Sequence, residues 1–115
     1  MKQGEAGSVI DELFAVIEQR KGGDPDTSYV ARSLSRGREH VAKKVGEEGV
    51  EVALAGALDD KPGVVSESAD LLFHLMILWS ATGVSPADVL EELSKRRGVS
   101  GFERDAARGR GGEER

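Results

Sequence analysis

The sequence contains no cysteine. This absence excludes disulfides, thiolate zinc sites, iron–sulfur clusters and cysteine nucleophiles, so any metal must be held by oxygen or imidazole ligands. Aromatic residues are scarce, at 4% of the 115 residues, and apolar residues make up 38%. Since compact domains span roughly 100–200 residues, we expect one domain with a modest core. A helical bundle or an oligomer would relieve the shortage of apolar side chains.

Charge and hydropathy give no sign of a nucleic-acid or membrane partner. The formal net charge is −5, from 21 acidic and 16 basic residues, and this balance does not favour binding to nucleic acid or to an anionic membrane. The longest apolar run, Leu71 to Trp79, is interrupted by His74 and is far shorter than the roughly 20 residues of a membrane span. Residues 1–7 contain no apolar signal core. We therefore expect a cytoplasmic protein.

Apolar residues recur with helical periodicity, and turn residues separate the periodic segments. The expected helices are residues 9–21, a short helix that follows Thr27 or Ser28 and stops near Gly37, residues 38–58, residues 64–81, and a last helix from a Ser85 cap to Arg97. Ser8 and Asp11 resemble a capping box at the first helix. No long stretch alternates with period two. The predicted fold is all-α, an antiparallel bundle of four to five helices completed by dimerisation.

Residues 1–97 are expected to form this all-α domain. Residues 98–115 contain five glycines, with Val99 and Phe102 as the only large apolar residues. This is too little apolar surface to pack against a core, so we expect the segment to be a flexible tail.

Acidic residues cluster on the third expected helix. Glu47, Glu48 and Glu51 lie within one 100° arc of the helix surface. Taken alone, such a triplet is most often a solvated helix face. Like charges four residues apart, as at Glu47 and Glu51, also repel one another.

A second polar line runs along the helix expected over residues 64–81. Glu67, Asp70 and His74 follow one another at spacings of three and four on a helix that is otherwise apolar on all sides. A helix of that kind should be buried, and buried carboxylates are costly unless they are paired or bind a metal. Helices joined by a short turn are antiparallel neighbours, so the two acidic lines can face each other. Oxygen ligands point to magnesium, with manganese as an alternative.

Basic residues precede the acids. Residues 32–44 contain Glu39 as their only acid, and their basic members are Arg32, Arg36, Arg38, His40, Lys43 and Lys44. One interpretation is a solvated face with partners one turn away, such as Lys44 with Glu48. The other is a binding surface for a polyphosphate, whose charge must be offset beside five carboxylates; Arg32, His40, Lys43 and Lys44 are the candidate contacts. His74 alone is more often a hydrogen-bonded core residue than a ligand.

The pattern Glu48-x-x-Glu51, fifteen residues, Glu67-x-x-Asp70 resembles the magnesium motif of the all-α nucleoside triphosphate pyrophosphohydrolases. Within that superfamily, residues 28–32, 43–51 and 67–75 resemble the phosphoribosyl-ATP pyrophosphohydrolases of histidine biosynthesis. The resemblance spans roughly residues 9–97.

The resemblance implies hydrolysis of the α–β phosphoanhydride of phosphoribosyl-ATP, which gives phosphoribosyl-AMP and pyrophosphate with magnesium. It implies Glu48, Glu51, Glu67 and Asp70 as metal ligands, and Glu47 as a further ligand or the group that orients the attacking water. Glu47 and Glu48 are therefore the candidate catalytic acids, and the family's fold is an all-α dimer. Two alternatives stay open: a housecleaning (d)NTP pyrophosphohydrolase, and a non-catalytic helical dimerisation module.

Overall fold

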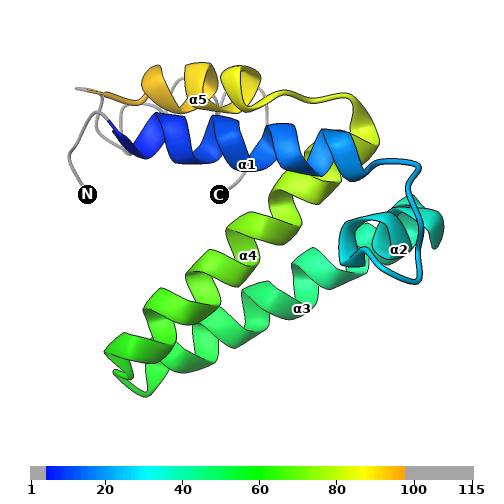
Figure 1. Cartoon of the computed structure of the whole chain (residues 1–115). Coiled ribbons are helices and arrows are strands. Elements are labelled where there is room, and N and C mark those ends of the chain that lie inside the picture. Colours follow the sequence, from blue (N-terminus) through cyan, green and yellow to red (C-terminus); the bar gives the residue numbers. More distant parts are fainter. Residues whose placement is uncertain (1–4, 98–115) are drawn as a thin grey trace, which may run out of the picture.

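The computed structural model describes residues 5–97, which contain α-helices and no strand (Figure 1). This confirms the predicted all-α class. The expected tail, residues 98–115, lies outside the described residues. The helices are α1 (Ala6–Arg20), α2 (Tyr29–Ser35), α3 (Arg38–Ala57), α4 (Lys61–Thr82) and α5 (Pro86–Ser94).

Local hydrogen bonds explain most helix ends. The Ser28 hydroxyl accepts from the backbone N–H of Ala31 at 3.1 Å and begins α2. Ser85 and Asp88 form a reciprocal capping box at the start of α5. Gly83, with φ of 76°, ends α4 in the left-handed conformation that glycine adopts at little cost. These ends are where the sequence predicts them.

Three helix ends differ from the prediction. α1 begins at Ala6, so Ser8 lies inside the helix and forms no capping box with Asp11. α4 begins at Lys61 and not at residue 64, because the Asp60 carboxylate caps the backbone N–H of Gly63 at 3.0 Å and a proline is tolerated in a first helical turn. α5 ends at Ser94, and the chain continues to residue 97 in tighter turns.

α3 and α4 form a long antiparallel hairpin that extends away from the other helices (Figure 1). α1 and α5 lie side by side across the C-terminal end of α4, and α2 packs against the beginning of α3. The core lies where α1, α2, α3 and α4 meet, and the buried apolar side chains of its central cluster are Ile17, Val30, Val41, Met76 and Ile77.

α4 is less buried than its composition predicts. Within this chain only His74, Met76, Ile77 and Ser80 of α4 are buried, and Val65 in its first half is 71% exposed. By length and composition alone α4 could cross a membrane, but core helices of soluble proteins meet the same criterion. α4 packs along α3 and carries the polar residues Glu67, Asp70 and His74.

Candidate active site

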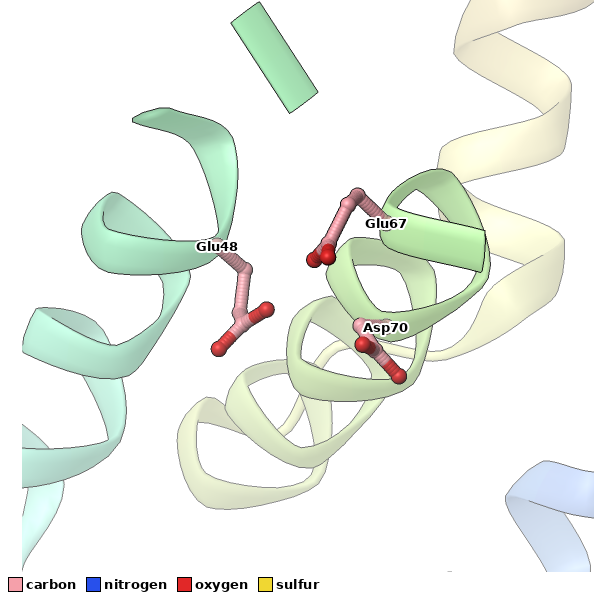
Figure 2. A group of neighbouring side chains, drawn as sticks. All are labelled: Glu48, Glu67 and Asp70. Carbon is pink, nitrogen blue, oxygen red and sulfur yellow. The ribbon is translucent and has the colours of Figure 1, made fainter. Parts of the chain in front are cut away.

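Three carboxylate side chains meet where α3 and α4 lie side by side. Glu48 comes from α3, and Glu67 and Asp70 come from α4 (Figure 2). One carboxylate oxygen of each residue lies within 4.8 Å of the other two. Glu48 and Glu67 are half-buried and Asp70 is exposed, so solvent reaches the triplet. The antiparallel hairpin therefore turns the two acidic lines toward each other.

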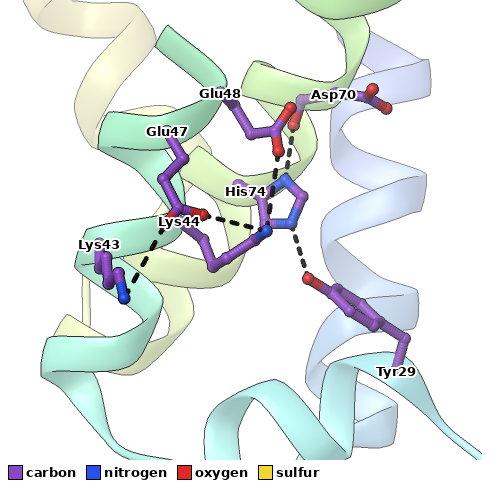
Figure 3. Close-up of polar contacts among 7 residues, drawn as sticks. All are labelled: Tyr29, Lys43, Lys44, Glu47, Glu48, Asp70 and His74. Carbon is purple, nitrogen blue, oxygen red and sulfur yellow. Dashed lines mark hydrogen bonds and ion pairs between the residues drawn. The ribbon is translucent and has the colours of Figure 1, made fainter. Parts of the chain in front are cut away.

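The remaining acids of the predicted site flank this triplet on α3. Glu51 is exposed and lies close enough for its charge to act on Glu67. Glu47 is also exposed, and its carboxylate forms ion pairs with Lys44 at 3.3 Å and with Lys43 at 3.9 Å (Figure 3). Neither Glu51 nor Glu47 belongs to the compact triplet.

The surroundings of Glu67 disfavour its ionised form. Burial raises the pKa of Glu67 above its ordinary value of 4.5, and the charges of Asp70, Glu51 and Glu48 raise it further, in that order. Both effects disfavour the ionised carboxylate. A bound cation would remove this penalty by offsetting the charges that cause it.

Lys44 of α3 lies beside two of these acids, Glu47 and Glu48. Its ammonium is 3.3 Å from Glu47 and 3.9 Å from Glu48 (Figure 3). The hydrogen bond with Glu47 raises the pKa of Lys44, burial opposes this, and the charges of Glu47, Tyr29 and Glu48 raise it again. Lys43 and Lys44 thus pair with acids one turn away, which is one of the two interpretations that the sequence leaves open.

The other basic candidates make no such contacts. Arg32 is exposed in the last turn of α2, and His40 is half-buried in the first turn of α3. Across residues 5–97 the side chains of Arg32 and His40 form no hydrogen bond or ion pair. Their assignment to substrate binding rests on charge and sequence position.

A tyrosine–histidine pair beside the acids was not identified as functional from the sequence. The Tyr29 hydroxyl lies 2.9 Å from Nε2 of His74, whose Nδ1 lies 2.9 Å from the backbone oxygen of Asp70 (Figure 3). His74 is buried, as expected of a hydrogen-bonded core histidine. Tyr29 and His74 are 45 residues apart, and no periodicity connects a residue of α2 with one of α4.

The model of the phosphoribosyl-ATP pyrophosphohydrolase family matches residues 10–97. The match covers all of α2 to α5 and most of α1, and it includes every acid of the site. It therefore extends over nearly all of the described fold and not only over the acidic motif.

Several relatives named phosphoribosyl-ATP pyrophosphatase are similar over most of the chain. The protein of Azospirillum brasilense is 48% identical over 103 residues, which cover 90% of this chain and 93% of the relative. The protein of Parvibaculum lavamentivorans is 50% identical, with coverages of 89% and 94%, and that of Rhodospirillum rubrum is 49% identical, with coverages of 87% and 86%. Together with the family match over residues 10–97, these similarities mean that the chain belongs to the phosphoribosyl-ATP pyrophosphohydrolase family.

Proposed function

We infer that this chain hydrolyses phosphoribosyl-ATP to phosphoribosyl-AMP and pyrophosphate, and so acts in histidine biosynthesis. The observation that carries this inference is the family match over residues 10–97, which includes the convergent acids of α3 and α4. Relatives that share about half of the sequence bear the name of this activity. Hydrolysis of a phosphoanhydride requires an activated water molecule and compensation of negative charge, and the acids and lysines beside them supply groups for both tasks.

Magnesium is the proposed cofactor, with manganese as an alternative. Glu48, Glu67, Asp70 and Glu51 would hold it, since three of them already bring oxygen atoms within 4.8 Å of one another. The donor set fits a hard cation, because it consists of carboxylates and the sequence lacks cysteine. Burial and the charges of Asp70, Glu51 and Glu48 raise the pKa of Glu67, so a bound cation would favour its ionised form. When bound, magnesium would offset the charge of the leaving pyrophosphate and lower the pKa of the attacking water.

The remaining residues of the site have complementary proposed roles. Glu47 and Glu48 are the candidates for orienting the attacking water and accepting its proton. The ammonium group of Lys44 lies 3.9 Å from Glu48, so a phosphate near the acids would meet a positive charge. Lys43 would act beside it, and Arg32 and His40 are proposed to contact parts of the nucleotide farther from the acids.

The protein is further proposed to act as a homodimer in the cytoplasm. Large apolar side chains are exposed along the α3–α4 hairpin, namely Val50, Leu54, Leu58, Val65 and Leu72. Large apolar side chains left exposed on two adjoining helices favour a contact with another protein surface, so a second copy would lie against this hairpin. Met76 of α4 belongs to the core of the single chain and is not part of this surface.

The direct test is pyrophosphate release from phosphoribosyl-ATP, ATP and dNTPs, each at a series of magnesium concentrations. Hydrolysis of phosphoribosyl-ATP well above that of the others supports the proposed function. Preference for dNTPs would identify a housecleaning enzyme, and no release from any nucleotide at saturating magnesium would identify a non-catalytic module. A chelator serves as the control, because magnesium-dependent activity must disappear when it is added.

A further inference from the structure

A hydrogen-bonded chain links α2 to the acidic part of α4. It runs from the Tyr29 hydroxyl to Nε2 of His74, and from Nδ1 of His74 to the backbone oxygen of Asp70, with both distances 2.9 Å (Figure 3). Tyr29 is the first residue of α2 and His74 lies in the middle of α4. Neither side chain has a role in the function proposed above, although both lie beside its acids.

The direction of these hydrogen bonds follows from the chemistry of the groups. A backbone carbonyl can only accept a hydrogen bond. Nδ1 of His74 therefore carries a hydrogen and donates a hydrogen bond to the backbone oxygen of Asp70. In the neutral imidazole, Nε2 is then an acceptor, and the Tyr29 hydroxyl donates to it. The phenolic hydrogen of Tyr29 is therefore used in the hydrogen bond to His74. The lone pairs of the Tyr29 oxygen remain available to accept hydrogen bonds from other groups.

The surrounding rings hold this arrangement in place. The Tyr29 ring stacks on Phe73 with a centroid distance of 6.4 Å and an interplanar angle of 30°, and Phe73 meets His74 edge-on at 5.6 Å. His74 itself is buried. The histidine therefore has little freedom to turn away from Tyr29.

Tyr29, unlike His74, faces solvent. It is 43% exposed, and it lies close to Lys44 (Figure 3). A tyrosine that served only to join two helices would not need an open face beside the site. The exposed part of Tyr29 is instead accessible to a molecule bound at the acids.

We propose that Tyr29 binds the substrate by accepting a hydrogen bond from a hydroxyl or amino group of its nucleoside part, and that His74 is the positioning residue which directs the tyrosine oxygen. This rests on the proposed function. Phosphate oxygens are acceptors and would be repelled by the tyrosine lone pairs, whereas ribose hydroxyls and the amino group of adenine donate. Lys44 and the acids therefore face the phosphates, and Tyr29 faces the nucleoside.

The first test is steady-state kinetics of Tyr29→Phe with phosphoribosyl-ATP. Phenylalanine keeps the ring that stacks on Phe73 and removes only the hydroxyl. Loss of one neutral hydrogen bond should raise KM about 3- to 10-fold and leave kcat within about twofold. Ser35→Ala is the matched control, because it also removes a hydroxyl from α2, one that bonds only to the backbone of its own helix.

Two substitutions of His74 separate positioning of Tyr29 from support of α4. In His74→Gln the side-chain oxygen can replace Nε2 and accept from Tyr29, so KM should stay close to that of the wild type. In His74→Asn the side-chain nitrogen can replace Nδ1 and donate to Asp70, but nothing reaches Tyr29, so KM should rise as in Tyr29→Phe. The double variant Tyr29→Phe/His74→Asn should be no worse than either single variant, because both remove one interaction.

Competition with AMP and with IMP identifies the donor. If Tyr29→Phe weakens inhibition by AMP but not by IMP, which lacks the amino group, the donor is the amino group; equal weakening of both indicates a ribose hydroxyl. An unchanged KM in Tyr29→Phe, or a fall in kcat at unchanged KM, overturns the proposal. So does a KM increase in His74→Gln equal to that in His74→Asn. Failure of the wild type to release pyrophosphate from phosphoribosyl-ATP refutes the proposed function instead, and is seen before any variant is compared.

Discussion

The half-buried carboxyl group of Glu67 couples the stability of the protein to pH. Burial and the charges of Asp70, Glu51 and Glu48 raise its pKa above 4.5 in the folded state, so the folded protein binds this proton more tightly than the unfolded chain does. The stabilisation that follows is fully present below about pH 4.5 and is lost as the pH rises through the folded-state pKa. Without metal, negative charge at Glu67 therefore weakens the fold near neutral pH.

This predicts a difference between wild type and Glu67→Gln in urea unfolding with a chelator present. As the pH rises from about 4.5 to 7, the unfolding free energy of the wild type should fall relative to that of the variant. Magnesium should then stabilise the wild type more than Glu67→Gln, because only the wild type has the full ligand set. Glu92→Gln, an exposed acid on α5, should follow the wild type at every pH. Parallel profiles for wild type and Glu67→Gln would contradict the prediction.

Two other carboxylates test whether the acids are ligands or surface charges. Asp70→Asn and Glu51→Gln keep the size of the side chain and remove its charge, so both variants should fold, with apo stability unchanged or raised. Each should lose at least about 10²-fold in kcat, the scale seen when one group that stabilises a transition state is removed. Excess manganese should restore part of the activity, since it binds such sites more tightly than magnesium.

Glu18→Gln and Glu92→Gln are the controls for these variants. Both acids are exposed on helices outside the site, α1 and α5, and both substitutions should leave kcat near that of the wild type. If all four substitutions had equal effects, the carboxylates of α3 and α4 would be a solvated helix face and the proposed mechanism would be wrong.

The turn between α3 and α4 depends on one glycine and one aspartate. The Asp60 carboxylate accepts from the backbone N–H of Gly63, and a Cβ at position 63 would overlap that carboxylate and come within 3.3 Å of Ala55. Gly63→Ala should therefore displace the cap and lower the unfolding free energy by about 1 kcal/mol, the usual cost of losing an N-cap. Thermal or urea unfolding measures the change.

Gly56→Ala is the matched control for this turn. Gly56 lies near the end of α3, and a Cβ there would meet nothing within 4 Å. Since alanine favours the helix by up to about 1 kcal/mol over glycine, this substitution should stabilise the protein. Equal effects of the two substitutions would show that Asp60 and Ala55 do not restrict position 63.

The same turn explains which features of the helices could be predicted from the sequence. Periodicity and caps predict the existence and order of all the helices. The sequence predicts the start of α4 three residues too late, because Pro62 and Gly63 are typical of a turn and only the position of the Asp60 side chain shows that the helix has begun. Ser8 similarly has the right neighbours for a cap, yet the helix extends past it to Ala6.

The candidate site, like the helices, can be predicted from the sequence only in part. Acids that share a helix face are visible as spacing in the sequence, and the short connection between α3 and α4 makes their facing arrangement an expectation. The contact between Tyr29 and His74 is not visible in this way. It depends on where α2 packs against α4, and that position is set by the whole core and not by any local pattern.

The described residues form an extended shape, and this shape supports the proposed dimer. Its radius of gyration is 16.3 Å, whereas a compact chain of about 100 residues has one of about 13 Å. The difference reflects the α3–α4 hairpin, which projects from the other helices (Figure 1). Along it, Leu54 is 55% exposed, Val65 71% and Leu58 79%. Each side chain of this kind gains roughly 1.5–3 kcal/mol when fully buried, so a second hairpin against this face would stabilise both copies.

Leu54→Glu tests this arrangement. Within the single chain Leu54 is solvent-exposed, so a charge there should be tolerated unless a partner covers it. We expect light scattering at micromolar concentration to give a dimer for the wild type, and a monomer or an unfolded chain for Leu54→Glu, because the carboxylate would be buried without a partner. Leu93→Glu is the control, since Leu93 on α5 is similarly exposed, at 59%, but lies away from the hairpin. A stable folded monomer of the wild type at that concentration would contradict the dimer, and the exposed apolar residues of α3 and α4 would then need another explanation.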